Sequence, residues 1–261
     1  MRQDFNSLGD RLKTLERKNQ DYLSPFSPVY ARLDGKAFSK FTKGMVKPFD
    51  EKLNNMMVDV AKVLLEETNA SIAYHQSDEI SIYWKNMHDW YSGRVDKILG
   101  ELVGLSTATI NQLTALNFPA KLGHFPRFDC RIFNVDETTA TEFFMWRQMD
   151  SIRNSISLCA QQHFSHKKLQ HVNSRMKKEW LRDIGEPWEQ LENRYKYGTF
   201  IRKEKTLMAI DKANINPEHH HKVPDEAVRN ITRALVYSPL QDFDDLHELM
   251  AFDTCEKYVI Q

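Results

Sequence analysis

Hydrophobic and polar residues alternate over residues 28–35, which read PVYARLDG. Val29, Ala31 and Leu33 fall on one side of an extended chain, and Asp34 falls on the other. A period of two that ends at a turn glycine is typical of a β-strand with one buried face. We therefore predict a strand that carries the Asp34 carboxylate at its end.

A helical period follows this strand. Asp50 can cap a helix in which hydrophobic residues recur at spacings of three and four from Leu53 to Leu64. The methionines of this stripe are interpreted as core residues. A second stripe runs from Val95 to Leu113, with Ser92 as its predicted cap. Both segments are predicted to be amphipathic helices.

Three further strands are predicted around these helices. SIAYHQ and ISIYW are separated only by Ser77, Asp78 and Glu79, which indicates a hairpin whose turn lacks glycine. FDCRIFNV, residues 128–135, has the composition of another strand. The order strand, helix, strand, strand, helix, strand predicts an α+β fold of the ferredoxin-like type. Its antiparallel sheet should carry the helices on one face, as in polymerase and cyclase palm domains.

The rest of the chain is predicted to extend this core. Thr139 and Glu142 form a possible capping box for a long helix, and helical sequence continues to about Leu181. Residues 195–210 have the pattern of two strand segments, and the chain from Ala227 onward has a weak helical pattern. We therefore divide the chain into a catalytic core (1–135), an integrated helical and strand extension (136–210) and a tail of unknown role (211–261).

Composition indicates a globular protein. The chain has 261 residues, of which 41% are hydrophobic and 28% are charged. No run approaches the roughly 18 apolar residues that span a bilayer, and the polar N-terminal segment lacks the apolar region of a signal peptide. The three cysteines are scattered without metal-ligand spacing. These features predict a cytoplasmic protein without a membrane segment.

Charge distribution leaves phosphate binding open. Lys plus Arg and Asp plus Glu both number 36, so the formal net charge is zero. Solvated surfaces account for any single basic cluster, yet three such clusters are compatible with phosphate ligands. The clusters comprise Lys36, Lys40, Lys43 and Lys47; Lys167, Lys168, Arg175, Lys177 and Lys178; and Arg194, Lys196, Arg202, Lys203 and Lys205.

Carboxylates at strand ends carry the strongest chemical signal. Asp34 ends the first predicted strand, and Asp78 with Glu79 lies in the hairpin turn. In a split βαβ sheet these positions can converge, and clustered carboxylates repel one another unless cations neutralise them. Mg²⁺ combines a few carboxylates with substrate phosphates, and paired ions serve phosphoryl transfer. Each motif alone is typical of an ordinary turn; together they predict a metal centre.

The same segments resemble the tRNA(His) guanylyltransferase family. The resemblance is carried by RLDGKAFSKF, VKPFDEKL and AYHQSDEISI, and then by WRQMD and the Tyr195–Thr199 segment YKYGT. It covers approximately residues 26–205 in order and spacing.

Membership of that family would imply 3′-to-5′ nucleotide addition to the 5′ end of tRNA, with GTP and ATP as substrates. The expected assembly is a homo-oligomer, possibly a tetramer. The resemblance implies two Mg²⁺ ions on Asp34, the Gly35 carbonyl and Asp78, with Glu79 beside them; Asp34, Asp78 and Glu79 are the expected catalytic residues. The expected nucleotide-binding residues are Asp34, Gly35, Lys36, Ala37, Phe38, Ser39, Lys47, Asp50, Ser77 and Asp78.

One departure from the family pattern affects the expected reaction. The family often has a histidine two residues after the aspartate of its WRQ-x-D segment, whereas this chain has Ile152, and only Asn154 of a following asparagine pair. An isoleucine neither transfers a proton nor donates to a phosphate. We therefore favour 5′-end repair over guanylate addition to histidine tRNA. The alternatives are a palm-type nucleotide cyclase and a non-catalytic RNA-binding palm protein.

Overall fold

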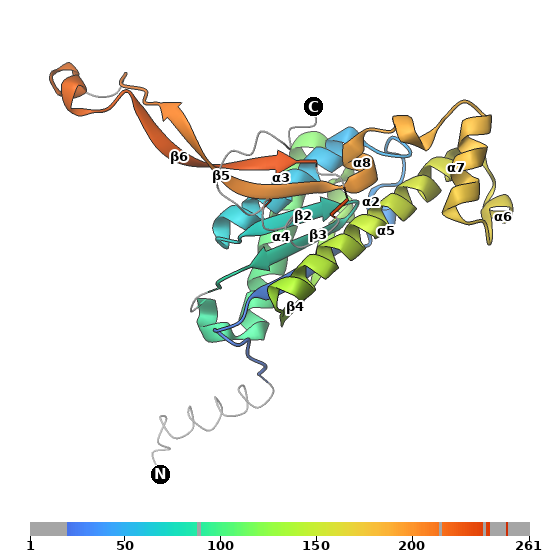
Figure 1. Cartoon of the computed structure of the whole chain (residues 1–261), viewed down its shortest axis with the longest axis horizontal. Helices are drawn as coiled ribbons and strands as arrows, with labels where there is room; N and C mark the ends of the chain where they lie inside the picture. The colour runs from blue at the N-terminus through green and yellow to red at the C-terminus, as the bar shows by residue number, and fades with distance from the viewer. Residues whose placement is uncertain (1–19, 88–89, 214–215, 237–238, 241–248, 250–261) are drawn as a thin grey trace, which may run out of the picture.

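The computed structural model describes residues 20–87, 90–213, 216–236, 239–240 and 249. Its centre is a six-stranded sheet in which every neighbouring pair is antiparallel, in the order β4-β1-β3-β2-β5-β6 (Figure 1). The strands are β1 (Val29–Lys36), β2 (Ile72–Gln76), β3 (Glu79–Trp84), β4 (Arg127–Asn134), β5 (Thr199–Ala209) and β6 (Glu226–Leu235).

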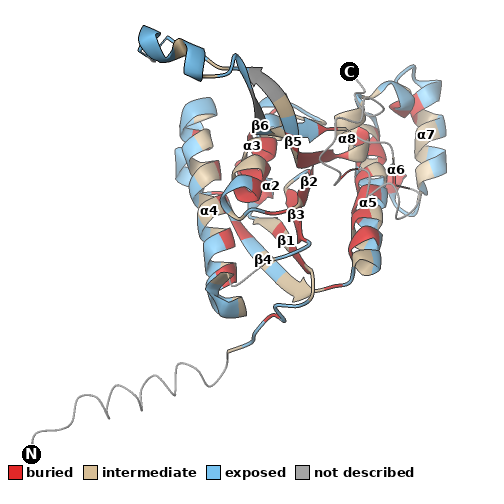
Figure 2. Ribbon diagram, turned by 60° about the vertical axis from the view of Figure 1, so that its left-hand side comes forward, coloured by how far each residue is buried: buried red, intermediate tan, exposed pale blue. Residues whose placement is uncertain are grey.

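Long helices cover both faces of the sheet (Figure 2). Helices α3 (Glu51–Glu67) and α4 (Val95–Asn117) pack on one face, where Ala31 and Leu33 of β1 join the largest hydrophobic core. Helix α5 (Glu137–His163) packs on the other, where Phe144 meets the fully buried Tyr30. The sheet is therefore the middle of three layers.

The predicted core topology is confirmed: β1, α3, β2, β3, α4 and β4 follow one another, and their strands pair as β4-β1-β3-β2. The prediction of helices on one face holds for α3 and α4 but omits α5. Burial explains the omission. Tyr30 lies on the face of β1 opposite the predicted buried one, yet Tyr30 and its cross-strand partner Tyr83 are both 0% exposed and require a covering layer.

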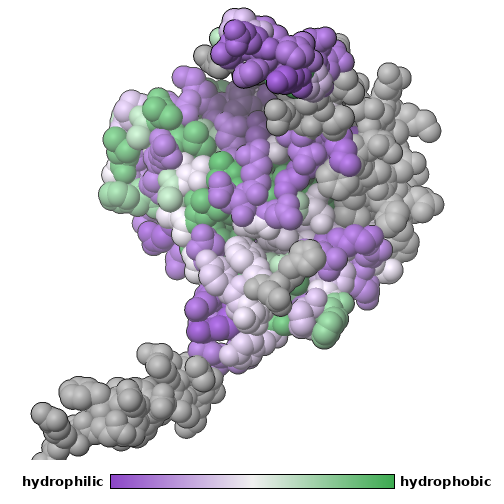
Figure 3. Space-filling view, turned by 90° about the vertical axis from the view of Figure 1, so that its left-hand side faces the viewer, coloured by the Kyte–Doolittle hydropathy of each residue, from purple (hydrophilic) through white to green (hydrophobic). Residues whose placement is uncertain are grey.

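Short elements extend the core at both ends. The far end of α5 packs against α7 (Ser174–Asp183) around a third hydrophobic cluster that includes Ile156, Leu181 and Trp188. The β5–β6 hairpin projects beyond the sheet, and its outer end faces the viewer in Figure 3 with mostly hydrophilic residues. The other short elements are α2 (Phe38–Phe41), α6 (His166–Leu169), α8 (Asn193–Tyr197), η1 (Trp90–Gly93), η2 (Pro119–His124), η3 (Trp188–Gln190) and η4 (Pro217–Lys222).

The C-terminal expectations need correction. The chain from Ala227, predicted to be helical, forms β6 as far as Leu235, because pairing with β5 along the whole strand outweighs a weak helical pattern. Residues 195–210 form one strand preceded by α8 rather than two strand segments. The tail beyond residue 249 and the N-terminal segment 1–19 lie outside the described residues.

The predicted helix caps are partly right. Asp50 caps α3, and its side chain accepts a hydrogen bond from the Leu53 amide at 3.1 Å. The cap of α5 is Asp136 rather than Thr139, because an aspartate at the preceding turn accepts from the Thr139 amide at 2.6 Å. Ser92 lies in η1, so it does not cap α4. Of the helices in the described ranges, none combines the length and apolar character that crossing a bilayer requires.

Candidate active site

The end of β1 meets the β2–β3 turn. Asp34 is the cross-strand partner of Glu79, and the Gly35 amide donates to the Asp78 carbonyl at 2.9 Å. A Cβ atom on Gly35 would lie 2.8 Å from the Asp78 Cβ and 2.6 Å from the Phe38 ring. Because real Cβ atoms do not approach so closely, only glycine lets the two chain segments come together here. The structure thus brings Asp34, Asp78 and Glu79 into neighbouring positions.

The turn itself holds a serine where a glycine is usual. Ser77 has φ of 54°, in the left-handed region that non-glycine residues rarely occupy. Its hydroxyl donates to Asp78 Oδ1 at 3.2 Å, and its carbonyl accepts from His75 Nε2 at 2.9 Å. Because a carbonyl only accepts, the proton of His75 lies on Nε2. The strained backbone of Ser77 therefore lies where the turn exposes the Ser77 hydroxyl and the Asp78 carboxylate.

Burial and repulsion act on the carboxylates. Burial raises the pKa of Asp78, and the charge of Asp34 raises it further, although the Ser77 hydroxyl opposes the shift. Burial also raises the pKa of Glu79, while the nearby Arg147 and Arg32 lower it. A site of adjacent oxygen donors in which ionisation is disfavoured fits a hard divalent cation, because the cation removes the repulsion.

Glu79 is held by arginine in this structure. Arg147 Nε on α5 donates to Glu79 Oε1 at 2.6 Å, and Arg32 Nε lies 3.9 Å from Oε2. Arg147 also donates to Asp150 Oδ2 at 2.7 Å. Across the described ranges, no group of three or more Asp, Glu, His or Cys residues is arranged to hold a metal ion. The predicted metal role of Glu79 thus stays a prediction, whereas its ion pair with Arg147 is observed.

A fourth carboxylate extends the row. Asp129 of β4 is the cross-strand partner of Asp34, so Asp129, Asp34 and Glu79 follow one another across three adjacent strands. The strand that contains Asp129 was predicted, but its register against β1 was not. Register depends on tertiary pairing, and a shift of one residue would turn this side chain to the opposite face.

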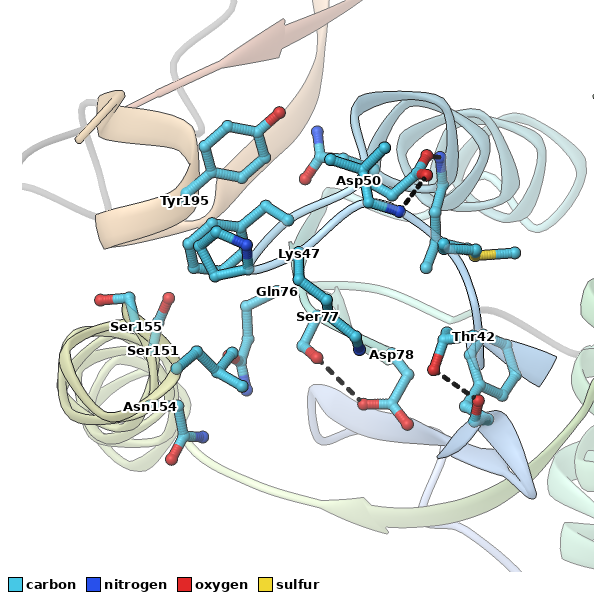
Figure 4. A pocket seen from close by; sticks show the side chains of 18 of the residues that line it. Thr42, Lys47, Asp50, Gln76, Ser77, Asp78, Ser151, Asn154, Ser155 and Tyr195 are labelled. Atoms are coloured by element: carbon cyan, nitrogen blue, oxygen red, sulfur yellow. Dashed lines mark hydrogen bonds between the residues drawn. The ribbon is translucent and has the colours of Figure 1, made fainter. Parts of the chain in front are cut away.

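A cavity of about 430 Å³ adjoins Asp78 (Figure 4). It lies between the loop that follows β1, the hairpin turn and α5. Six of the predicted nucleotide-binding residues line it: Phe38, Ser39, Lys47, Asp50, Ser77 and Asp78. The other four, residues 34–37, are not among its lining residues: the first three end β1, and Ala37 precedes α2.

Lys47 and Asp50 have different surroundings. Lys47 is exposed, and its side chain extends into the cavity toward Ser77 and Asp78 (Figure 4). Asp50 accepts hydrogen bonds from the amides of Val46 and Leu53 at 3.1 Å each. Lys47 is therefore available to a ligand, while Asp50 shapes the loop that carries it.

The far wall of the cavity was not predicted. It is formed by Ser151, Asn154 and Ser155 of α5 and by Arg194 and Tyr195 of α8. The Tyr195 ring stacks on Phe49 with centroids 4.7 Å apart and planes 11° apart. The YKYGT segment was a signal for Tyr195, but only the tertiary fold places α5 and α8 opposite the β1 loop.

Four further residues near the cavity and the acidic turn have distinct surroundings. Ile152, at the position of the family histidine, packs against the third hydrophobic cluster, and the exposed Arg153 pairs with Asp150. His75 is buried, and burial lowers its pKa to about 4. Trp146, which follows Met145 on α5, is 49% exposed.

Comparison with known proteins identifies relatives of the chain. A family model described as tRNAHis guanylyltransferase matches residues 9–136. An uncharacterized protein of Acanthamoeba polyphaga mimivirus is 27% identical over 225 residues, which are 76% of this chain and 77% of that protein. The tRNA(His) guanylyltransferase of Schizosaccharomyces pombe is 31% identical over 140 residues, 52% of this chain and 54% of the yeast protein. The matched region thus spans about half the length of the yeast relative.

Solved structures extend the match. A bacterial tRNA(His) guanylyltransferase-like protein in complex with ATP is 34% identical, with a TM-score of 0.71 over 76% of this chain and 87% of that one. Another, in complex with GTP, is 26% identical, with a TM-score of 0.72 over 93% of this chain and 96% of that one.

Proposed function

The chain belongs to the tRNAHis guanylyltransferase family, and we propose that it is a Mg²⁺-dependent palm enzyme that adds nucleotides in the 3′-to-5′ direction to the 5′ end of a tRNA. GTP and ATP are its proposed substrates, in line with the triphosphates named for its structural relatives. The observation that carries the proposal is the meeting of Asp34 and Asp78 beside a cavity that Lys47 enters.

Asp34, Asp78 and the Gly35 carbonyl would hold the divalent ions, with Glu79 as a further predicted ligand. All are oxygen donors, and the raised pKa of Asp78 reflects a site that favours a neutralising partner. When bound, such ions neutralise phosphate charge and favour ionisation of an attacking hydroxyl. Arg147 fixes the position of Glu79, so the protein supplies both the donors and their orientation.

The triphosphate would lie against the segment that follows β1. Ala37 has φ of 66°, and α2 begins at Phe38, so the chain turns tightly after β1 and the first amides of a helix follow. Such amides attract anions, and the Lys47 ammonium adds a mobile positive charge. Phosphoryl transfer depends mainly on positioning and charge neutralisation, which these groups provide.

The proposed reaction is template-dependent 5′-end repair rather than guanylate addition to histidine tRNA. Ile152 supplies no proton donor, and its side chain packs into a hydrophobic cluster, so it does not replace a histidine. Asn154 does line the cavity. A cytoplasmic location and a tetrameric assembly stay predictions from the sequence.

The proposal is tested by a 5′-extension assay. The substrate is 5′-monophosphorylated tRNA that lacks its first nucleotide, and each labelled triphosphate is offered separately. We expect RNA-dependent incorporation at the 5′ end. Incorporation only into intact histidine tRNA would support guanylate addition instead, and a labelled product formed without RNA would support a cyclase.

A further inference from the structure

The face of β1 and β4 beside the acidic centre carries charges that repel one another across the strands. Side chains directly opposite in an antiparallel pair lie about 5 Å apart, and like charges there are destabilising. Three successive opposite pairs on this face have like charges. They are Lys36 with Arg127, Asp34 with Asp129, and Arg32 with Arg131.

Little within the protein compensates these charges. Among the described residues, the one ion pair within 4.0 Å that involves any of the six is that of Arg32 with Glu79. Arg127, Asp129 and Arg131 are all exposed. Diagonal neighbours of opposite sign lie about 7–8 Å apart and attract one another only weakly in water. The face therefore presents two cationic bands on either side of an anionic band, an arrangement that external ions of opposite sign would stabilise.

The β4 members of these bands lie on the side of the acidic centre away from the cavity. The cavity is bounded by the β2–β3 turn, whereas β4 pairs with the other edge of β1. Nucleotide transfer to a 5′ end brings two phosphate-bearing molecules to one centre. The cavity accommodates one of them, and the banded face is the adjacent cationic surface for the other.

An exposed aromatic ring borders the same face. Trp146 of α5 is 49% exposed, and its ring centroid lies 5.7 Å from Arg32 Cζ and 4.4 Å from Arg147 Cζ. Met149, on the same helix, is 66% exposed. A planar ring next to guanidinium groups is the combination that binds unpaired nucleotides, by stacking on the base and by attraction to the phosphate.

We propose that the charged bands of β1 and β4, together with Trp146, form the docking surface for the 5′-phosphorylated end of the RNA substrate. This inference rests on the proposed function. Phosphates of the RNA end lie on the bands of Arg127 and Arg131, which flank the acidic centre, and a terminal base stacks on Trp146. The two cationic pairs are then retained because the phosphates of the bound RNA neutralise them.

The test measures binding of 5′-monophosphorylated tRNA lacking its first nucleotide, by fluorescence anisotropy at several salt concentrations. Arg131→Gln should weaken binding about tenfold and reduce the slope of log affinity against log salt by about one. Trp146→Ala should weaken it about tenfold with the slope unchanged. The control is Arg175→Gln, whose exposed arginine pairs with Glu179 on α7, and it should bind as the wild type does.

ATP affinity and the melting temperature separate this role from a structural one. ATP affinity should be unchanged in Arg131→Gln, and its melting temperature should be no lower than that of the wild type, because the substitution relieves repulsion. Wild-type RNA affinity and salt slope in Arg131→Gln would overturn the docking surface while leaving the proposed function intact. A wild-type protein that binds ATP but extends no RNA would overturn the proposed function itself.

Discussion

Arg147 Nε on α5 donates a 2.6 Å hydrogen bond to Glu79 Oε1 on β3, and both side chains are buried. This ion pair connects α5, which forms one wall of the cavity, to β3, which begins at the β2–β3 turn. It also turns the Glu79 carboxylate toward α5, so the geometry of the centre depends on a residue 68 positions away in the chain.

Arg147→Met should lower the free energy of unfolding by roughly 3 kcal/mol, because it leaves Glu79 buried without its principal partner. The double variant Arg147→Met/Glu79→Gln should recover part of this loss, since it removes the unpaired charge. Urea denaturation measures both. A double variant that is less stable than the single one would contradict the ion-pair interpretation.

Asp78→Asn should reduce nucleotide transfer roughly a thousandfold while the fold persists, because an amide keeps the shape but loses the charge that holds a divalent ion. Asp59→Asn is the matched control, since Asp59 pairs with Lys62 on α3 away from the site. Single-turnover assays and melting curves measure the two effects. Equal activity of the two variants would remove Asp78 from the catalytic centre.

Lys47→Ala should raise the KM for the triphosphate about tenfold without changing stability, because the exposed side chain loses only its contact with phosphate. Lys43 is also exposed on the same loop but does not line the cavity, so Lys43→Ala should keep the wild-type KM. Steady-state kinetics on both variants decide the point; the same KM for both would place Lys47 outside the binding site.

Tyr195→Ala should raise the triphosphate KM, because it removes from the cavity wall the ring that stacks on Phe49. Tyr195→Phe keeps the ring and should retain nearly wild-type kinetics. If both variants lose activity equally, the hydroxyl rather than the stacking is important.

The protein should become less stable as the pH decreases, because His75 is buried in its neutral form. Its pKa is lowered from 6.5 to about 4 by burial, so the unfolded chain binds a proton more readily than the folded protein does. The contribution of His75 is fully present above pH 6.5 and is lost as the pH falls toward 4, at roughly 1.4 kcal/mol per pH unit. His75→Gln, which can still donate to the Ser77 carbonyl, should show a flatter profile in urea titrations between pH 4 and 7; an unchanged profile would contradict the assignment.

The elements that could be predicted from the sequence are those with a clear local pattern. Alternation located β1, and helical spacing with Asp50 as cap located α3, because both signals lie within a few residues. The resemblance placed Phe38, Ser39, Lys47 and Ser77 at one site, and these residues do line one cavity.

Features that depend on distant pairing were missed. Asp129 faces Asp34 only through the β1–β4 register, and Arg147 reaches Glu79 only because α5 crosses the second face of the sheet. Strand β6 was mistaken for a helix, because its partner β5 rather than its own sequence determines its conformation. Packing between elements thus accounts for the rest of the site.

Equilibrium binding of Mn²⁺ in the presence of a non-hydrolysable GTP analogue, followed by the electron paramagnetic resonance of the free ion, tests the acidic centre most directly. The wild type should bind the ion, and Asp34→Asn and Asp78→Asn should each weaken binding at least tenfold, because both carboxylates are needed to hold it. Wild-type affinity in both variants would show that Asp34 and Asp78 do not form a metal site.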